Sequence, residues 1–170
     1  RGGSVVVPDV LMALFSATGD GSLAVTSDAP VSASARVSSR RDEGGYGAFE
    51  SAVPAGSAGT VPSGTPKDSV GAPQTDTRRT DLLLFNGGTD RAVVTVTAYD
   101  EAGNPIGSTD VPVAAGQSLR LPAVIAGLGG GPTDSGRIRV ALAGGGGGSV
   151  TALVEVIELG TGDVDFAPLR

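Results

Sequence analysis

Histidine, cysteine and tryptophan are all absent from this sequence of 170 residues. A serine or cysteine nucleophile needs a nearby base, usually histidine, and no such pair can be built here. The single lysine, Lys67, lies in a Pro-rich stretch where nothing would hold it beside a serine. Zinc and other borderline metals also lose their preferred ligands. The sequence therefore predicts a protein that is not an enzyme, with no catalytic residue, no cofactor and no metal site.

Paired carboxylates are the chemistry that this composition leaves open, because two acids can hydrolyse a glycoside and several can bind calcium. The acidic residues stand in predicted turns, at Asp42-Glu43, Asp100-Glu101 and Asp163-Val164-Asp165. Calcium takes roughly six to eight oxygen ligands. These turns, or Asp20 with Asp28, offer too few ligands locally. We interpret these acids as solvated turn residues.

Basic charge is also scarce, with 12 Lys and Arg against 18 Asp and Glu and a net charge of -6. The charges form no block, so no nucleic acid or membrane surface is expected as a partner. No apolar run approaches the roughly 18 residues of a membrane span. The start, Arg1-Gly2-Gly3, has no initiator Met. We expect the numbering to begin inside a longer precursor, with any export signal already removed.

The sequence is rich in residues that form strands and tight turns, with 28 Gly and abundant Val, Ala, Ser and Thr. In residues 91–99, Val94, Val96 and Ala98 fall on one face of a predicted strand, and residues 100–105 form a turn that leads into a hairpin. Further strands are expected at residues 82–85, 117–121, 137–142 and 150–157. Many short strands separated by turns predict an all-β, antiparallel β-sandwich of the Ig-like kind.

Two segments are expected to be short helical turns, at residues 8–15 and 122–128. Each begins with Pro, which suits the first turn of a helix. These segments lie in an internal repeat, since Ser-Val-Val-Val-Pro-Asp-Val at 4–10 aligns with Ser-Leu-Arg-Leu-Pro-Ala-Val at 118–124. The offset there is 114, from residue 4 to residue 118. Repeats of this kind decide the architecture.

The alignment continues toward the end of both segments, with offsets that rise to 119 as loop lengths change. Residues 23–25 align with residues 138–140, and Gly45 aligns with Gly162. The alternating residues Val31, Ala33, Ala35 and Val37 align with Val150, Ala152, Val154 and Val156. Phe49 aligns with Phe166, and we interpret this pair as equivalent core residues.

The repeat predicts three parts in the chain. Residues 1–50 form the back half of a first β-sandwich copy, and residues 81–170 form a complete second copy. Residues 51–80 are rich in Pro, Gly, Ser and Thr, which is the composition of a linker.

Several strand and turn motifs resemble a repeated β-sandwich (Ig-like) module of large secreted bacterial proteins of uncharacterised function. The matching stretches are Arg-Thr-Asp-Leu-Leu-Leu-Phe-Asn at 79–86, residues 94–100, Gly103-Asn104, Gly107, residues 23–31, residues 44–49 and Thr161-Gly162-Asp163. The resemblance implies a β-sandwich fold and a bacterial protein at the cell surface or outside the cell. These motifs are not active-site residues, so it implies no activity. Residues 51–80 depart from the pattern of the module.

The function expected from these features is that of a non-enzymatic extracellular structural or adhesive module. A sandwich copy without its front strands exposes sheet edges that another strand can fill. We predict a strand-exchange segment at Val5, Val6 and Val7, with copies of the protein or a neighbouring domain as partners. Chains joined in this way would form a surface filament. The alternative is a carbohydrate- or protein-binding accessory domain of a larger secreted protein, with Tyr46 or Tyr99 contacting a glycan.

Overall fold

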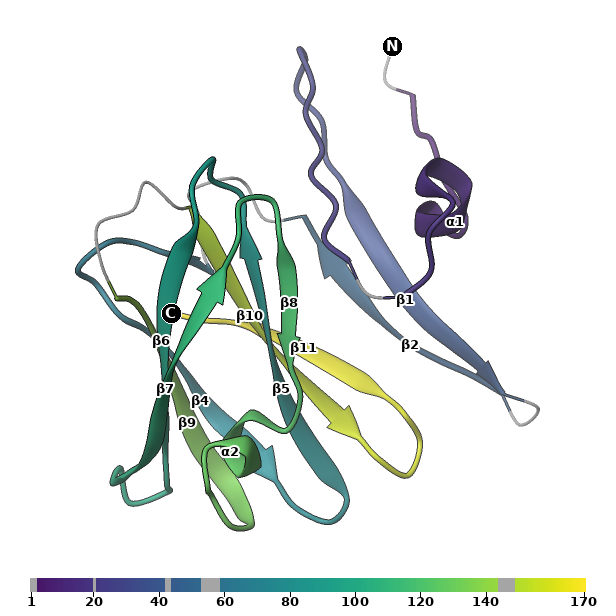
Figure 1. Ribbon diagram of the computed structural model, residues 1–170. Coiled ribbons are helices and arrows are strands. Elements are labelled where there is room, and N and C mark those ends of the chain that lie inside the picture. Colours follow the sequence, from purple (N-terminus) through teal and green to yellow (C-terminus); the bar gives the residue numbers. More distant parts are fainter. Residues whose placement is uncertain (1–2, 20, 42–43, 53–58, 144–148) are drawn as a thin grey trace.

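The computed structural model describes residues 3–19, 21–41, 44–52, 59–143 and 149–170. In chain order the helices and strands are α1 (Val10–Phe15), β1 (Ser34–Arg41), β2 (Gly44–Ser51), β3 (Thr60–Val61), β4 (Lys67–Gln74), β5 (Arg78–Asn86), β6 (Ala92–Tyr99), β7 (Pro105–Val113), β8 (Ser118–Leu121), α2 (Val124–Gly127), β9 (Thr133–Leu142), β10 (Val150–Glu158) and β11 (Val164–Pro168). Figure 1 shows strands β3 to β11 gathered in one body, with α1, β1 and β2 beside it.

Strands β3 to β11 form an antiparallel β-sandwich, which confirms the predicted fold class. One sheet has five strands, in the order β11-β10-β5-β8 with β3 also paired to β10, and the other has four, in the order β4-β9-β6-β7. Strand β5 therefore lies between β8 and β10, and strand β9 lies between β4 and β6. These two central positions matter for the N-terminal part of the chain.

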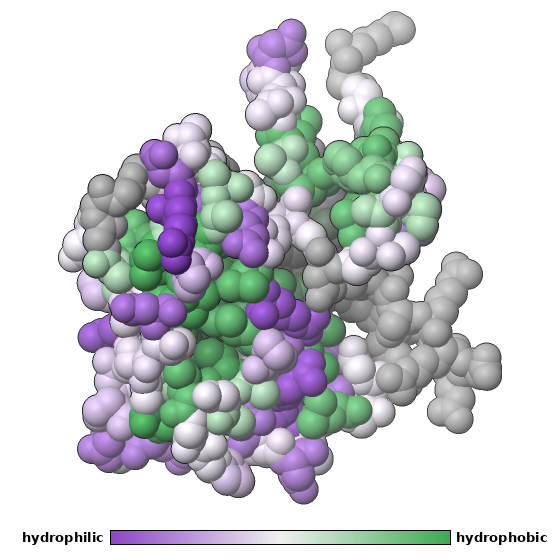
Figure 2. Space-filling view, in the orientation of Figure 1, coloured by the Kyte–Doolittle hydropathy of each residue, from purple (hydrophilic) through white to green (hydrophobic). Residues whose placement is uncertain are grey.

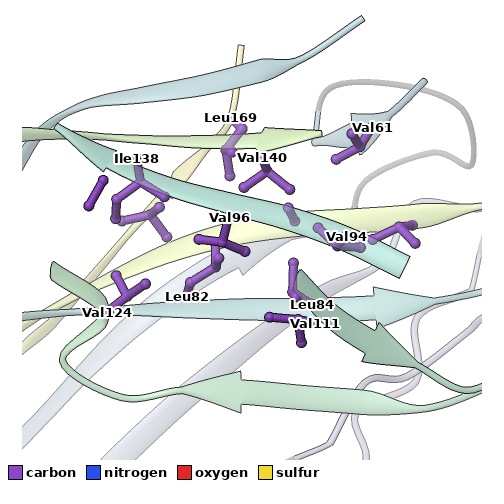
Figure 3. Packing of buried hydrophobic residues seen from close by; sticks show 14 of the residues in the cluster. Val61, Leu82, Leu84, Val94, Val96, Val111, Val124, Ile138, Val140 and Leu169 are labelled. Atoms are coloured by element: carbon purple, nitrogen blue, oxygen red, sulfur yellow. The ribbon is translucent and has the colours of Figure 1, made fainter. Parts of the chain in front are cut away.

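The core lies between the two sheets and follows the alternation of the strands (Figure 3). In β6, every second residue is buried, including Val94 and Val96 as the sequence predicted. Leu82 of β5 and Val140 of β9 meet this face, because side chains on one side of a strand recur every two residues. Burial of these residues drives folding, since a fully buried Val or Leu contributes about 1.5–3 kcal/mol.

The predicted helical turns and the predicted hairpin are present. Helices α1 and α2 lie at Val10–Phe15 and Val124–Gly127, inside the two ranges that begin with Pro. Strands β6 and β7 pair through the turn at Asp100, whose carboxylate accepts hydrogen bonds from the backbone and side-chain N–H groups of Asn104. Among the described residues, no helix is long and apolar enough to cross a membrane.

The linker predicted at residues 51–80 was wrong over much of its length. It contains β3, β4 and the first residues of β5, so the sandwich begins before residue 81. Strand β4 is at the edge of its sheet and pairs with β9 through two register shifts near Gly71 and Pro73. An edge strand tolerates Gly and Pro, which lack a side chain or an N–H group. Composition alone therefore hid a strand. Residues 53–58 lie outside the described residues.

Two strands expected from the repeat are also missing. No strand is assigned to Val5–Val7 or to residues 23–25, although their aligned partners lie in β8 and β9. Strand β8 pairs with β5, and β9 pairs with β4 and β6. The described residues before β3 contain no counterpart of these partner strands, so neither segment has a ladder to join.

Candidate functional site

The N-terminal segment, residues 3–52, carries apolar side chains on its surface. Val5 is 88% exposed, Val31 is 62% exposed and helix α1 has no buried residue. Figure 2 shows apolar residues gathered over α1 and the chain beside it. Isolated exposed apolar residues are common on proteins, but a contiguous group marks a surface that binds another protein surface.

The exposed residues of this segment align with core residues of the sandwich. Val25 is 53% exposed, whereas Val140, its aligned partner, is fully buried at 0%. The same holds for Val31 and its aligned partner Val150, which is also fully buried. The amino acid is identical in both pairs, so the difference in exposure comes from the surrounding strands.

The two helices share an unusual backbone conformation at aligned positions. The residue before α1, Asp9, has φ 49° and ψ 60°, and the residue before α2, Ala123, has φ 47° and ψ 48°. Left-handed conformations are uncommon for residues other than glycine. Nevertheless Val10 and Leu11 of α1 are only half-buried, whereas α2 buries both Val124 and Ile125.

The two C-terminal hairpins also share a pairing register. In β1-β2, Arg36 lies opposite Phe49, and in β10-β11, Glu155 lies opposite Phe166. Offsets of 119 for the first strand and 117 for the second, as the sequence alignment gives them, map one pair onto the other. Phe166 is half-buried, outside the fully buried core, and the side chain of Phe49 lies outside the described side chains.

The position of the missing strand follows from the sheet order. Strand β10 pairs with β11 on one edge and with β5 on the other, and β5 also pairs with β8. Strand β1 pairs with β2, and no second ladder partner of β1 occurs among the described residues. The aligned N-terminal order is thus β2, β1, an unfilled position of the β5 type and then residues 4–7. We call this position the strand gap.

In the sandwich, the strand at this position carries a buried carboxylate. Asp81 of β5 is fully buried and accepts hydrogen bonds from Arg79, from Arg120 at 2.8 Å and from the backbone N–H of Ala123 at 2.8 Å. Arg120 also pairs with Glu155 at 2.6 Å. A buried carboxylate is costly unless it is paired and hydrogen-bonded. This cluster therefore joins β5, β8, β10 and the start of α2 in one polar network.

Sequence analysis did not find this cluster. Asp81 begins an apolar run in β5, and a charge at a position that faces inward was the signal that could have revealed it. In the N-terminal segment, Val6 aligns with Arg120 and Arg36 aligns with Glu155. The positive charge is therefore transferred from the β8 type of strand to the β10 type.

The acidic turn residues bind to the turns themselves. Hydrogen bonds from Asn104 lower the pKa of Asp100, and the backbone N–H of Asp134 with the hydroxyl of Thr133 lowers the pKa of Glu101. The hydroxyl of Thr161 donates to Asp163. Within the described ranges, no group of three or more His, Cys, Asp or Glu residues could hold a metal ion. Asp20, Asp42 and Glu43 lie outside these ranges.

Elsewhere on the sandwich, polar and aromatic groups are occupied by neighbouring side chains. The guanidinium of Arg137 lies 3.9 Å from the centre of the Tyr99 ring, so one face of this aromatic is covered. The side chain of Tyr46 lies outside the described side chains. A hollow of about 50 Å³ separates Gly21 and Ser22 from β5 and β8, and the N–H of Ser22 donates to the hydroxyl of Ser118. Ligand pockets typically have roughly 300–1,000 Å³, so this hollow is too small for one.

Comparisons with known proteins place the chain more firmly. A solved structure titled "Crystal Structure of Thermotoga maritima 1070" matches with a TM-score of 0.51 and 15% identity, over 64% of this chain and 94% of that chain. At this identity the likeness shows a shared fold. No curated protein matches the sequence. The model of a family of unknown function, DUF5719, matches residues 13–124, which is more than half of the chain. The chain therefore belongs to the DUF5719 family.

Proposed function

We propose that this protein is a non-enzymatic structural module of an extracellular or cell-surface bacterial protein, and that its N-terminal segment is the back half of a second sandwich. The observation that carries the proposal is the pairing of exposed with buried residues. Val25 and Val31 are exposed, and their aligned partners Val140 and Val150 have no exposure at all. Completion by further strands would bury them and would join one sandwich to the next.

The two backbone correspondences support the same assignment. The left-handed residue before each helix and the shared hairpin register are independent of side-chain exposure. Each would be matched by accident only rarely, because left-handed residues other than glycine are uncommon and hairpin register is set by turn and sequence pattern. Together they favour one fold for both halves.

A structural role also fits the use of the sandwich's buried polar groups. Asp81 accepts four hydrogen bonds, and the side chain of Asn86 bonds to the backbone of Gly88, Asp90 and Val113. These groups hold strands and turns together, and none of them is left to act on a substrate. The sequence has no histidine or cysteine that would supply another base or nucleophile.

Assembly in solution tests the structural role. Strands supplied by a neighbouring molecule would make a contact that does not close, and the chains would form filaments. Size-exclusion chromatography across a range of concentrations and negative-stain images of the 170-residue chain would show them. Binding of a hydrophobic dye by a monomer, lost in the Leu23→Ser/Val25→Ser/Val31→Ser variant, is expected where the strands are absent. A monomer that binds no dye would overturn the proposed half sandwich.

A further inference from the structure

The strand gap shows which kind of polypeptide completes the N-terminal segment. We infer that it takes a front half of the type formed by residues 59–117, placed directly ahead of Ser4 in a row of sandwiches, with its β5-type strand in the strand gap. This inference rests on the proposed half sandwich and adds the identity of the missing strands. The argument uses sheet order, register, charge and the number of halves.

Sheet order fixes where the incoming strand lies. In the sandwich, β5 pairs with β10 so that Leu82 lies opposite Val154 and Asn86 lies opposite Val150. Shifted by the offset of 119, the same register places a β5-type strand against β1, with its Leu82 position opposite Ala35. On its other edge it would pair with residues 4–7, as β5 pairs with β8. Val5 and Val7 would then be covered, as Leu119 and Leu121 are partly covered in the sandwich.

Charge complementarity favours a β5-type strand with an acid at the position of Asp81. In the sandwich, Asp81 is the Cα partner of Glu155 and takes its cation from Arg120. In the N-terminal segment, the residue aligned with Arg120 is Val6, and the residue aligned with Glu155 is Arg36. Arg36 would therefore lie directly opposite the incoming acid. A buried carboxylate needs such a cation.

The number of halves decides where the front half comes from. Residues 4–170 hold two segments of the back-half type but one front half, and β8 to β11 already complete that front half. Copies of this segment alone have none to spare. The family match begins within α1 and ends in α2, so it is close to the 114-residue offset in length. A family unit of one repeat fits a row of sandwiches along one polypeptide.

The test duplicates residues 59–117 ahead of residue 4 in the full chain, because Gln117 precedes Ser118 as the added Gln117 would precede Ser4. Hydrogen exchange then reports on β1. We expect the outward-facing amides of Ser34–Arg41 to exchange at least about 100-fold more slowly than in the chain without the addition, since they gain ladder partners. Dye binding should fall in the same sample.

Two matched variants keep the test specific. A fusion with Leu82→Asp and Leu84→Asp in the added half alone should leave β1 unprotected, while the original sandwich stays folded. Arg36→Glu in the fusion should remove most of the protection, and Asp81→Arg in the added half should restore it. Unprotected β1 amides in the unaltered fusion would overturn the inference. Protection that Arg36→Glu leaves unchanged would overturn the charge pairing.

The native chain separates this inference from the filament. If the chain alone forms oligomers that protect β1, a second copy fills the strand gap, so the inference fails and the filament stands. If the chain stays monomeric while the fusion protects β1, the filament fails and the inference stands.

Discussion

Two regions of this chain share a sequence pattern and differ in their surroundings. Helices α1 and α2 begin with the same left-handed residue, yet only α2 buries side chains. Residues 23–25 align with the middle of β9, yet only β9 lies between two partner strands. The difference teaches that the back half of this sandwich specifies its helix and its hairpin locally, whereas its other strands need the front half to form.

The largest effect is expected at the buried carboxylate that only the complete sandwich contains. Asp81→Asn removes the charge that pairs with Arg79 and Arg120, and breaking a buried ion pair costs about 3–5 kcal/mol. We expect about 3 kcal/mol in the free energy of unfolding, because both arginines keep some contact with water. Chemical denaturation measures it.

The control for Asp81→Asn is Asp134→Asn, which breaks the exposed pair with Arg78. That pair spans 3.5 Å at the surface and should matter by less than about 0.5 kcal/mol. Equal losses from both variants would show that the buried cluster does not stabilise the sandwich.

The next effect compares one amino acid in two settings. Val140→Ala empties part of the core and should lower the free energy of unfolding by about 2–3 kcal/mol. Val25→Ala, at the aligned and exposed position, should change it by less than about 0.5 kcal/mol. Thermal and chemical unfolding of the two variants measure both. A large loss in Val25→Ala would mean that the N-terminal segment is already packed in the isolated chain.

A third effect tests the close approach of the front half to the back half. A Cβ atom at Gly107 of β7 would lie 2.3 Å from the carbonyl oxygen of Leu128, after α2. Gly107→Ala should therefore destabilise the sandwich by about 1–3 kcal/mol, the usual cost of overpacking. Gly131→Ala, where nothing lies within 4 Å, is the control. A neutral Gly107→Ala would show that β7 and α2 separate easily.

The smallest effect depends on pH and concerns the pair between β4 and β9. The hydrogen bonds from Arg139, at 2.8 and 2.9 Å, lower the pKa of Asp68 below its usual 3.8. A depressed pKa stabilises the folded state above the unfolded value, and this stability is lost as pH falls through the folded value. The difference in stability between the wild type and Asp68→Asn should shrink below pH 3.8. A difference that persists at lower pH would exclude this ion pair as its cause.

Much of the fold could be predicted from local pattern. The alternation of Val94, Val96 and Ala98, the turn at Asp100 and the two Pro-led helices all lie where the sequence placed them. These features depend on residues a few positions apart, so their periodicity is visible in the chain. Strand β4 was missed because an edge strand needs few apolar residues, and its Pro and Gly have the composition of a linker.

The candidate site was predicted in part. The sequence pointed to Val5, Val6 and Val7 as a segment in need of a partner, and their exposure agrees with that prediction without testing strand exchange. It could not show that the gap lies between them and β1, because that follows from the sheet order. It also missed Asp81, whose partners Arg120 and Ala123 are about forty positions away.

By itself, the sequence determined the all-β class, the short helices and the alignment of residues 4–49 with 118–166, because each is set by spacing along the chain. Only the tertiary structure decided that β4 is a strand, that Asp81 is buried between arginines and that one aligned valine is covered while the other is exposed. The physical reason is that burial and strand pairing are properties of neighbours brought from elsewhere in the chain. A segment that lacks those neighbours keeps its pattern but not its sheet.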